Sequence, residues 1–174
     1  MNSLAVMQEM ADQVRASTLE ILQAAKPQWL TSSLPGLSNH IIWHAGHALW
    51  LQDMLFLQPL GEQGVMPFAY VPLFCQGSKA VRRNKYPSRE MLVDLLRQQL
   101  DHMKQAMRHC DGARLTGKAP GLSDRYNLGG WMLHALHDEA RHGGEMYLLY
   151  KVCREVDKQR RNAEKQRSAS MPAG

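Results

Sequence analysis

The residues of this chain that are best suited to chemistry are its histidines. Eight occur, and six of them fall within two short windows, residues 40–47 and 134–142. Neutral imidazole is the commonest metal-binding side chain in proteins. Two histidine windows far apart in the sequence predict one metal site, provided that the fold brings the windows together.

The first window lies in a segment with helical periodicity, residues 38–58. On a helical wheel of about 100° per residue, His47 lies in the middle of the apolar face, between Trp43 and Trp50. His44 lies about 60° from this line. His40 lies about 20° from it, but two turns nearer the start of the helix. His47 is therefore the residue of this window that we expect to point inward.

The second window contains an acid and a histidine four residues apart. This spacing places Asp138 and His142 on one face of a helix. His137 lies about 140° from His142, so a regular helix cannot aim both imidazoles at one ion. The geometry selects Asp138 over His137, although imidazole is the better ligand by chemistry. The predicted metal ligands are His47, Asp138 and His142.

Two imidazoles and one carboxylate resemble the protein ligands of catalytic zinc sites, which keep a further position for water or substrate. Zinc is the first expectation, and iron, nickel or manganese would also suit this set. Glu139 and Glu145 lie about 60° from His142, where they could accept hydrogen bonds from a ligand, act as spare ligands or transfer a proton. His134, one turn before Asp138, could hydrogen-bond to that carboxylate.

The same residues allow plainer interpretations: a buried polar cluster without metal, or histidines that face solvent. Burial of Asp138 without a cation or a hydrogen-bond donor would be costly, which favours the metal site. A di-iron bundle requires two Glu-x-x-His motifs, and the chain contains only Glu139-x-x-His142.

Four helical segments must position these side chains, and no segment shows a convincing strand pattern. The segments cover residues 3–26, 38–58, 87–110 and 127–154. Ser38 or Asn39 could cap the second, Pro87 suits the first helical position of the third, and Asn127 could cap the fourth. We expect an all-α four-helix bundle. Residues 59–86, between its second and third helices, contain several aromatics and predict a long ordered loop that covers one end of the bundle.

The length of 174 residues fits one domain. We expect the bundle to occupy residues 1–155 and a basic, frayed tail to occupy residues 156–174. From Lys151 onward the chain has seven bases and three acids, so this end carries +4 of the net charge of +5. A basic tail could bind nucleic acid, but a solvated helix end is the plainer interpretation, and nucleic acid is not the partner that we expect.

No apolar run approaches the roughly 20 residues that span a bilayer, and the N-terminal residues lack the pattern of a signal peptide. The three cysteines are scattered and suit a reducing compartment: Cys75, Cys110 and Cys153. We expect a cytoplasmic protein that does not bind membranes.

Two helices carry a second apolar stripe, opposite the predicted site. The stripes are Ile42, Leu49 and Phe56 on the second helix, and Leu133, Leu136, Ala140 and Tyr147 on the fourth. A helix that is apolar on two sides is wrapped by other elements or forms a subunit interface, and we expect a homodimer. The bases Arg82, Arg83 and Lys85 could bind an anionic substrate, although a solvated loop is the plainer interpretation.

Three motifs, in this order and spacing, resemble one family. NHIIWHAGHALW (39–50), YPSREML (86–92) and HxxxDxxxHGGE (134–145) are similar to those of the DinB/YfiT-like superfamily of bacterial four-helix-bundle metalloenzymes. The resemblance covers about residues 1–155 and places the family's metal ligands at His47, Asp138 and His142. The chain departs from the family pattern twice: Asp138 stands where histidine is common, and Glu145 stands where glutamine is usual.

The resemblance implies a homodimeric, metal-dependent enzyme that acts on a small molecule. Its most concrete form is a transferase that attaches a low-molecular-weight thiol, as co-substrate, to an electrophile, or a hydrolase that uses metal-bound water. The alternative is a non-catalytic helical module, related to stress or to partner binding, with a relic metal site. The sequence does not identify catalytic residues beyond the ligands.

Overall fold

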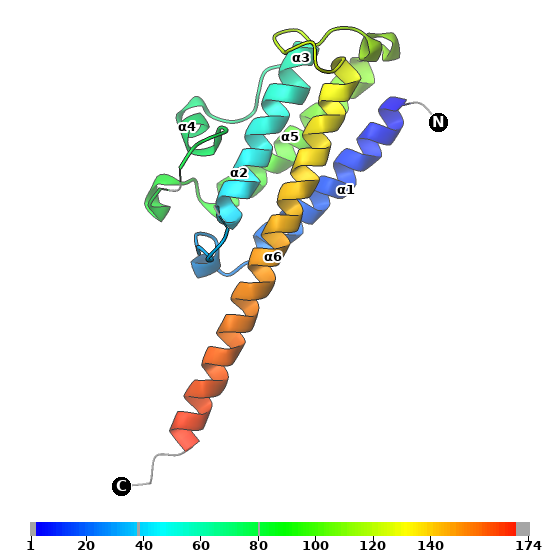
Figure 1. The fold of residues 1–174 in the computed structure, drawn as a ribbon. Helices are drawn as coiled ribbons and strands as arrows, with labels where there is room; N and C mark the ends of the chain where they lie inside the picture. Colours follow the sequence, from blue (N-terminus) through cyan, green and yellow to red (C-terminus); the bar gives the residue numbers. More distant parts are fainter. Residues whose placement is uncertain (1–2, 38, 80, 170–174) are drawn as a thin grey trace.

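The computed structural model describes residues 3–37, 39–79 and 81–169. Its long helices are α1 (Ser3–Ala24), α2 (Ile41–Gln52), α5 (Arg89–His109) and α6 (Leu128–Ala169). They lie side by side as a bundle, and α6 projects far beyond the other three (Figure 1). The predicted all-α bundle is confirmed: the described residues form no strand, and their only β-type pairing is one isolated bridge between Lys118 and Asn127.

The predicted second helix continues through two further elements. The π-helical turn η2 (Asp53–Leu57) follows α2, and α3 (Gln58–Leu60) follows η2. The helix ends at the left-handed Gly61, with a φ of 92°, so Pro59 lies inside its last turn and does not end it. A π turn holds one extra residue, which rotates the following side chains about the axis. Gln52 and Asp53 flank the second apolar stripe of α2 on a regular wheel, and both are buried beside it.

The helix starts differ in part from the predictions. The N-cap of α2 is His40, whose ring Nδ1 accepts a hydrogen bond from the backbone N–H of Trp43 at 3.2 Å. Asn39 is therefore not the cap, and Ser38 lies outside the described residues. Ser88 caps α5 by accepting from the N–H of Met91, so Pro87 precedes the cap and is not the first helical residue.

The long connection after α3 is ordered and contains η3 (Phe68–Tyr70), α4 (Val71–Phe74) and η4 (Arg83–Lys85). The sequence predicted that it would cover one end of the bundle, but it runs along the side of α2 (Figure 1). Two contacts hold it there. Asp53 accepts the N–H of Met66 at 2.7 Å. The fully buried Phe74 lies against Gly46, where a Cβ would come within 2.3 Å of the Phe74 ring.

The interior contains apolar side chains from every long helix and one fully buried ion pair. Ile42, Leu49 and Phe56 all lie in this core, so the chain's own elements cover the second apolar stripe of α2. Arg15 of α1 and Glu139 of α6 lie at its centre, with 2.7 Å between Nε and Oε1. The hydrogen bonds that complete this network come from Thr18, Gln52, Gln99 and the Leu96 carbonyl.

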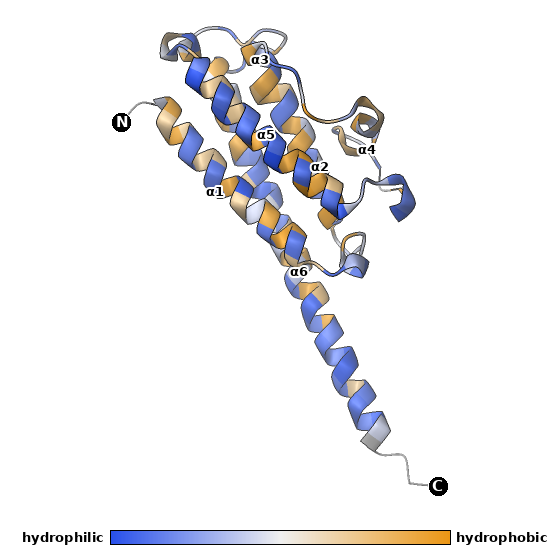
Figure 2. Ribbon diagram, turned by 180° about the vertical axis from the view of Figure 1, so that it is seen from behind, coloured by the Kyte–Doolittle hydropathy of each residue, from blue (hydrophilic) through white to orange (hydrophobic). Residues whose placement is uncertain are grey.

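Beyond the bundle, α6 continues as a regular helix to Ala169, where the sequence predicted a frayed tail from residue 156. This part of α6 is almost entirely hydrophilic, whereas orange apolar residues are common within the bundle (Figure 2). Two connections close the remaining gaps: η1 (Pro27–Trp29) follows α1, and η5 (Gly112–Thr116) follows α5. None of the described helices has the length and apolar character needed to cross a membrane.

Candidate metal centre

The three side chains singled out from the sequence lie together where α2 packs against α6. Asp138 Oδ2 lies 3.2 Å from His142 Nε2 and 3.9 Å from His47 Nε2. One ligand atom from each residue lies within 4.8 Å of the other two. All three residues are at most 9% exposed. The helices thus place two imidazoles and one carboxylate at the separations that a single cation requires.

Residues 61–79 of the long connection after α3, which we call the cover segment, fix the orientation of His47. Its ring Nδ1 lies 2.7 Å from the carbonyl oxygen of Phe74. A carbonyl only accepts hydrogen bonds, so Nδ1 carries the proton and Nε2 keeps its lone pair. The indole of Trp43 stacks on the ring, with 4.6 Å between centroids and 11° between planes. His47 is therefore held in the tautomer and orientation that a metal ligand needs.

The ring of His142 is held by a second histidine. Its Nδ1 lies 2.8 Å from Nδ1 of His44, so one of these nitrogens donates to the other. Its Nε2 is buried beside Asp138 and has no aligned hydrogen-bond partner. Buried polar atoms without a partner are rare in folded proteins. A cation bound between His47, Asp138 and His142 would give this nitrogen the partner that it lacks.

Asp138 remains ionised in this environment. Burial by itself raises the pKa of its carboxyl group, but the adjacent His142, Arg141 and His47 outweigh burial and hold the pKa below its ordinary value. Arg141 Nη2 contacts Oδ1 at 2.8 Å, whereas Oδ2 faces the two histidines. One carboxylate oxygen is therefore available to a cation while the other is held in place.

The histidines of α2 favour the neutral form. Burial lowers the pKa of His47 below its ordinary value. Burial, together with the neighbouring His142, lowers the pKa of His44 to about 3. Neutral imidazole is the form that binds metals, so these rings need not lose a proton first at neutral pH.

His44 has a role that the helical wheel did not predict. Its Nε2 lies 3.2 Å from Oε2 of Glu145, so a chain of contacts runs from His142 through His44 to a carboxylate that is 43% exposed. His44, His142 and Glu145 also form a second group with ligand atoms close enough for one cation. The signal was present in the sequence, because His44 is three residues before His47 and thus one turn away.

Four other residues considered from the sequence have roles away from this centre. Glu139 pairs with Arg15 and is neither a spare ligand nor a proton-transfer group here. The ring of His134 lies against Tyr126 and Trp131, with no hydrogen bond to Asp138 among the described residues. His137 is exposed, and His40 caps α2.

The residues present fit a divalent metal ion. Two neutral imidazole nitrogens and one carboxylate oxygen are the ligand types of zinc centres, and they leave a further coordination position. The centre is almost closed, because Trp43 and the cover segment pack over it. Its most exposed neighbours are Arg141 and Glu145, so the centre lies nearest to solvent on their side. A cavity of about 570 Å³ lies elsewhere, between α1 and α6.

Comparisons with known proteins agree with this fold. The family model described as DinB superfamily matches residues 10–146, well over half of the chain. A crystal structure of a conserved protein from Enterococcus faecalis superposes with a TM-score of 0.68 at 12% sequence identity. The match covers 87% of this chain and 96% of that one. No curated protein matches the sequence.

Proposed function

Because the chain belongs to the DinB superfamily, we propose that it is a metal-dependent enzyme whose ion is held by His47, Asp138 and His142. Zinc is the ion that we propose first, since the ligand set is two imidazoles and one carboxylate. The observation that carries this proposal is the convergence of three buried ligand atoms: Asp138 Oδ2 lies 3.2 Å from Nε2 of His142, which forms no aligned hydrogen bond, and 3.9 Å from Nε2 of His47.

The reaction that fits this centre is transfer of a low-molecular-weight thiol to an electrophile, or hydrolysis. When bound, the ion supplies a Lewis acid that lowers the pKa of a coordinated thiol or water. The chain supplies the rest. The Phe74 carbonyl keeps the proton on Nδ1 of His47, and the Asp138 carboxylate balances the positive charge of the ion. Trp43 excludes water from one side of the centre. Glu145, at the exposed end of the contact chain through His44, is placed to hold a proton at Oε2.

The metal content of protein purified without a nickel column tests this proposal. We expect about one equivalent of metal per chain in the wild type and in His137→Ala, a matched control because His137 is exposed on the same helix. His47→Ala and His142→Ala should lose most of it. Thiol-transfer and hydrolysis assays on the metal-loaded protein then separate the two reactions. Equal, negligible metal in the wild type and the variants, even after incubation with zinc, would refute the proposal.

One contact favours a second candidate function, a non-catalytic helical module with a relic site. Arg141 already contacts Asp138 at 2.8 Å and balances its charge without a metal. This alternative predicts a protein that folds normally, binds no zinc and is unaffected by chelators. The metal analysis described above decides between the two functions.

A further inference from the structure

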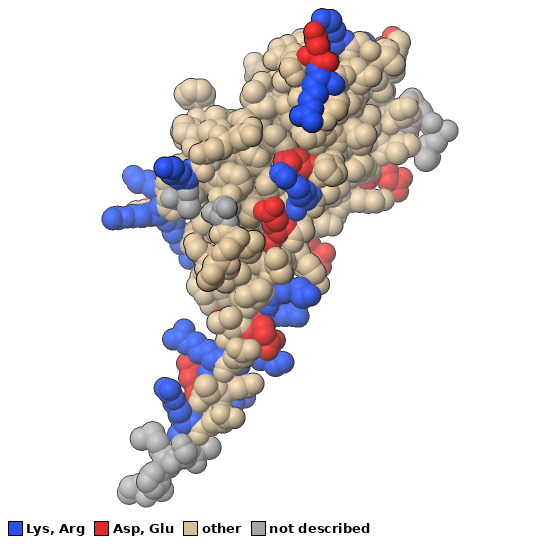
Figure 3. Space-filling model, in the orientation of Figure 1, with Lys and Arg blue, Asp and Glu red and all other residues tan. Residues whose placement is uncertain are grey.

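The part of α6 beyond the bundle carries a one-sided row of bases. Lys151, Arg154, Lys158, Arg161 and Lys165 recur every three or four residues and are all exposed. On a helical wheel they fall within about 80° of one another, and no acid falls in this sector. At about 1.5 Å per residue the row is about 21 Å long. We refer to these five residues as the basic row; basic side chains predominate along this part of the helix (Figure 3).

Most acids of this segment form ion pairs with bases that do not belong to the row. Asp157 contacts Lys26 of the body at 2.6 Å, and Glu164 contacts Arg160, which is on the opposite side of the helix, at 3.5 Å. Glu155 Oε2 lies 4.0 Å from Nζ of Lys158, which belongs to the row. Among the described residues, no carboxylate forms an ion pair with the other four bases of the row. The row is therefore a line of positive charge that is largely uncompensated within the chain.

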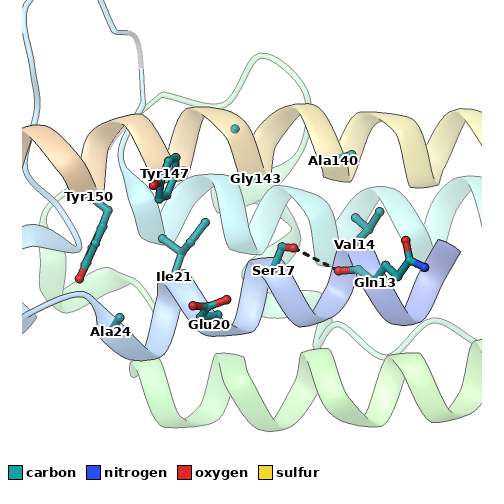
Figure 4. A pocket seen from close by; sticks show the side chains of 11 residues that line it. Gln13, Val14, Ser17, Glu20, Ile21, Ala24, Ala140, Gly143, Tyr147 and Tyr150 are labelled. Atoms are coloured by element: carbon teal, nitrogen blue, oxygen red, sulfur yellow. Dashed lines mark hydrogen bonds between the residues drawn. The ribbon is translucent and has the colours of Figure 1, made fainter. Parts of the chain in front are cut away.

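The row leads into a cavity between α1 and α6. This groove between α1 and α6, of about 570 Å³, is lined by Tyr147 and Tyr150 (Figure 4). Lys151 Nζ stands 5.4 Å from the ring centroid of Tyr147, and the Arg154 guanidinium stands 5.7 Å from that of Tyr150. The first two bases of the row thus lie over the two aromatics that line the cavity.

The groove has the features of a site for a flat, polar group. Gly144 on its wall has no atom within 4 Å of where a Cβ would lie, so the space beside the helix is open. Tyr147 is 53% exposed and offers a ring face. Gln13, Ser17 and Glu20 of α1 supply hydrogen-bonding groups on the opposite wall. The carboxylate of Glu20 would repel a phosphate but would accept a hydrogen bond from an amino or hydroxyl group.

The charge of the tail alone did not lead us to expect nucleic acid, but from the one-sided row and the groove beside it we propose that the two together bind single-stranded nucleic acid. The phosphates lie along the row, and one base stacks on Tyr147 in the groove. Non-specific sites for single strands combine a positively charged track, which binds the phosphates, with aromatic side chains on which bases stack. A membrane is the weaker fit, because Val156 is the only large exposed hydrophobic residue described between Lys151 and Ser168. The site lies outside the metal centre and does not depend on the proposed function.

Fluorescence anisotropy of full-length protein with a labelled oligothymidylate of about 12 nucleotides tests this inference. Five phosphate contacts on a single strand give a slope of about −3.5 for the logarithm of the association constant against the logarithm of salt concentration. The double variant Arg154→Gln/Arg161→Gln should bind at least about tenfold more weakly, with a slope shallower by about 1.4. Tyr147→Ala should weaken binding about tenfold and leave the slope unchanged.

The matched control is Arg160→Gln/Arg167→Gln, which removes the same charge from the opposite side of the same helix. It should change affinity by less than about twofold. Equal losses in the two double variants would overturn the proposal, since the binding would then depend on net charge alone. It would also be overturned by absent binding at low salt, or by tighter binding to a duplex, to phosphatidylglycerol vesicles or to polyglutamate than to the single strand. Circular dichroism checks that each variant keeps its helix content.

Discussion

A neutral histidine has two ring nitrogens, and only the one without a proton can bind a metal. The hydrogen bond made by the other nitrogen decides which of the two this is. In this protein a carbonyl of the cover segment fixes His47, and a second histidine holds His142. The ligands of the candidate centre are therefore oriented by residues that the ligand pattern itself does not include. At the scale of single residues, the first prediction concerns such a supporting residue.

His44→Ala removes the partner of Nδ1 of His142 and leaves all three proposed ligands in place. Loss of such a supporting hydrogen bond typically weakens metal binding by about 10- to 100-fold. We expect this loss when zinc is titrated into the metal-free protein in competition with a chelating dye. His134→Ala is the control, because His134 contacts only aromatic rings among the interactions described. Unchanged affinity in His44→Ala would show that His44 does not support the site.

The buried histidines predict that the metal-free protein loses stability in acid. Burial lowers the pKa values of His40, His44 and His47 in the folded state, that of His44 to about 3. In the unfolded chain these rings take up protons near pH 6.5. The contribution of these neutral rings to the free energy of unfolding is therefore complete above pH 6.5. It is lost as the pH falls from 6.5 toward the folded pKa values, by up to about 1.4 kcal/mol per pH unit for each ring.

Urea unfolding of chelator-treated protein at pH 7.5 and pH 5.5 measures this effect. The free energy of unfolding should be lower at pH 5.5, with an unchanged dependence on urea concentration. Equal stability at the two pH values would mean that the rings are protonated or exposed in the folded protein.

At the scale of elements, the contact between α2 and the cover segment determines whether the centre forms. Gly46 lets Phe74 approach α2 closely enough for its carbonyl to reach His47. Asp53, the first residue of the π-helical turn η2, is buried and accepts a hydrogen bond from the Met66 N–H of the cover segment. The buried ion pair of Arg15 and Glu139 joins α1 to α6 in the core. Loss of one partner of such a pair is far more damaging than loss of a surface ion pair.

Gly46→Ala should destabilise the protein and also weaken the metal centre. The new Cβ would lie 2.3 Å from the Phe74 ring, so the ring and its carbonyl must move. Overpacking of this kind costs about 1–3 kcal/mol. Thermal unfolding and zinc titration of the variant would measure both effects.

Gly144→Ala is the matched control, because a Cβ at this helical position meets nothing within 4 Å. An exposed helical Gly→Ala change stabilises by about 0.5–1 kcal/mol. Destabilisation in both variants would show that the loss in Gly46→Ala is not caused by the contact with Phe74.

At the scale of the whole molecule, the homodimer stays a prediction. The structure reduces the number of residues in the predicted apolar stripes that could form its interface. The second stripe of α2 is buried in the chain's own core and gives no support to an interface. On α6, Leu136 is also buried, whereas Leu133 and Tyr147 are 46% and 53% exposed. Tyr147 also lines the groove that we propose for single-stranded nucleic acid, so an interface that leaves this groove open must be built around Leu133.

Light scattering coupled to gel filtration should give the mass of two chains for the wild type. Leu133→Glu should shift the protein toward the monomer, because a charge within an apolar interface is not compensated there. Met91→Glu is the matched control, since Met91 is 44% exposed on α5. A monomeric wild type would contradict the prediction of a dimer.

Much of this structure follows from local rules that the sequence contains. Apolar periodicity predicted the four long helices, because each must bury one face, and the spacing of Asp138 and His142 placed both side chains on one face of α6. The rejection of His137 as an inward ligand rested on the same geometry, and His137 is exposed. The fold class and the three candidate ligands could therefore be predicted from regular helix geometry.

Features that depend on contacts between distant segments were decided only by the tertiary structure. The wheel placed Glu139 near the site, but Arg15, far away in the sequence, pairs with it in the core. His44 gained its role from His142 on another helix, and His40 displaced the expected cap of α2. The path of the cover segment along α2 depends on Gly46, Phe74 and Asp53 acting together. Helix periodicity is fixed by a few neighbouring residues, whereas the partner of a buried polar group depends on which helices meet and in what register.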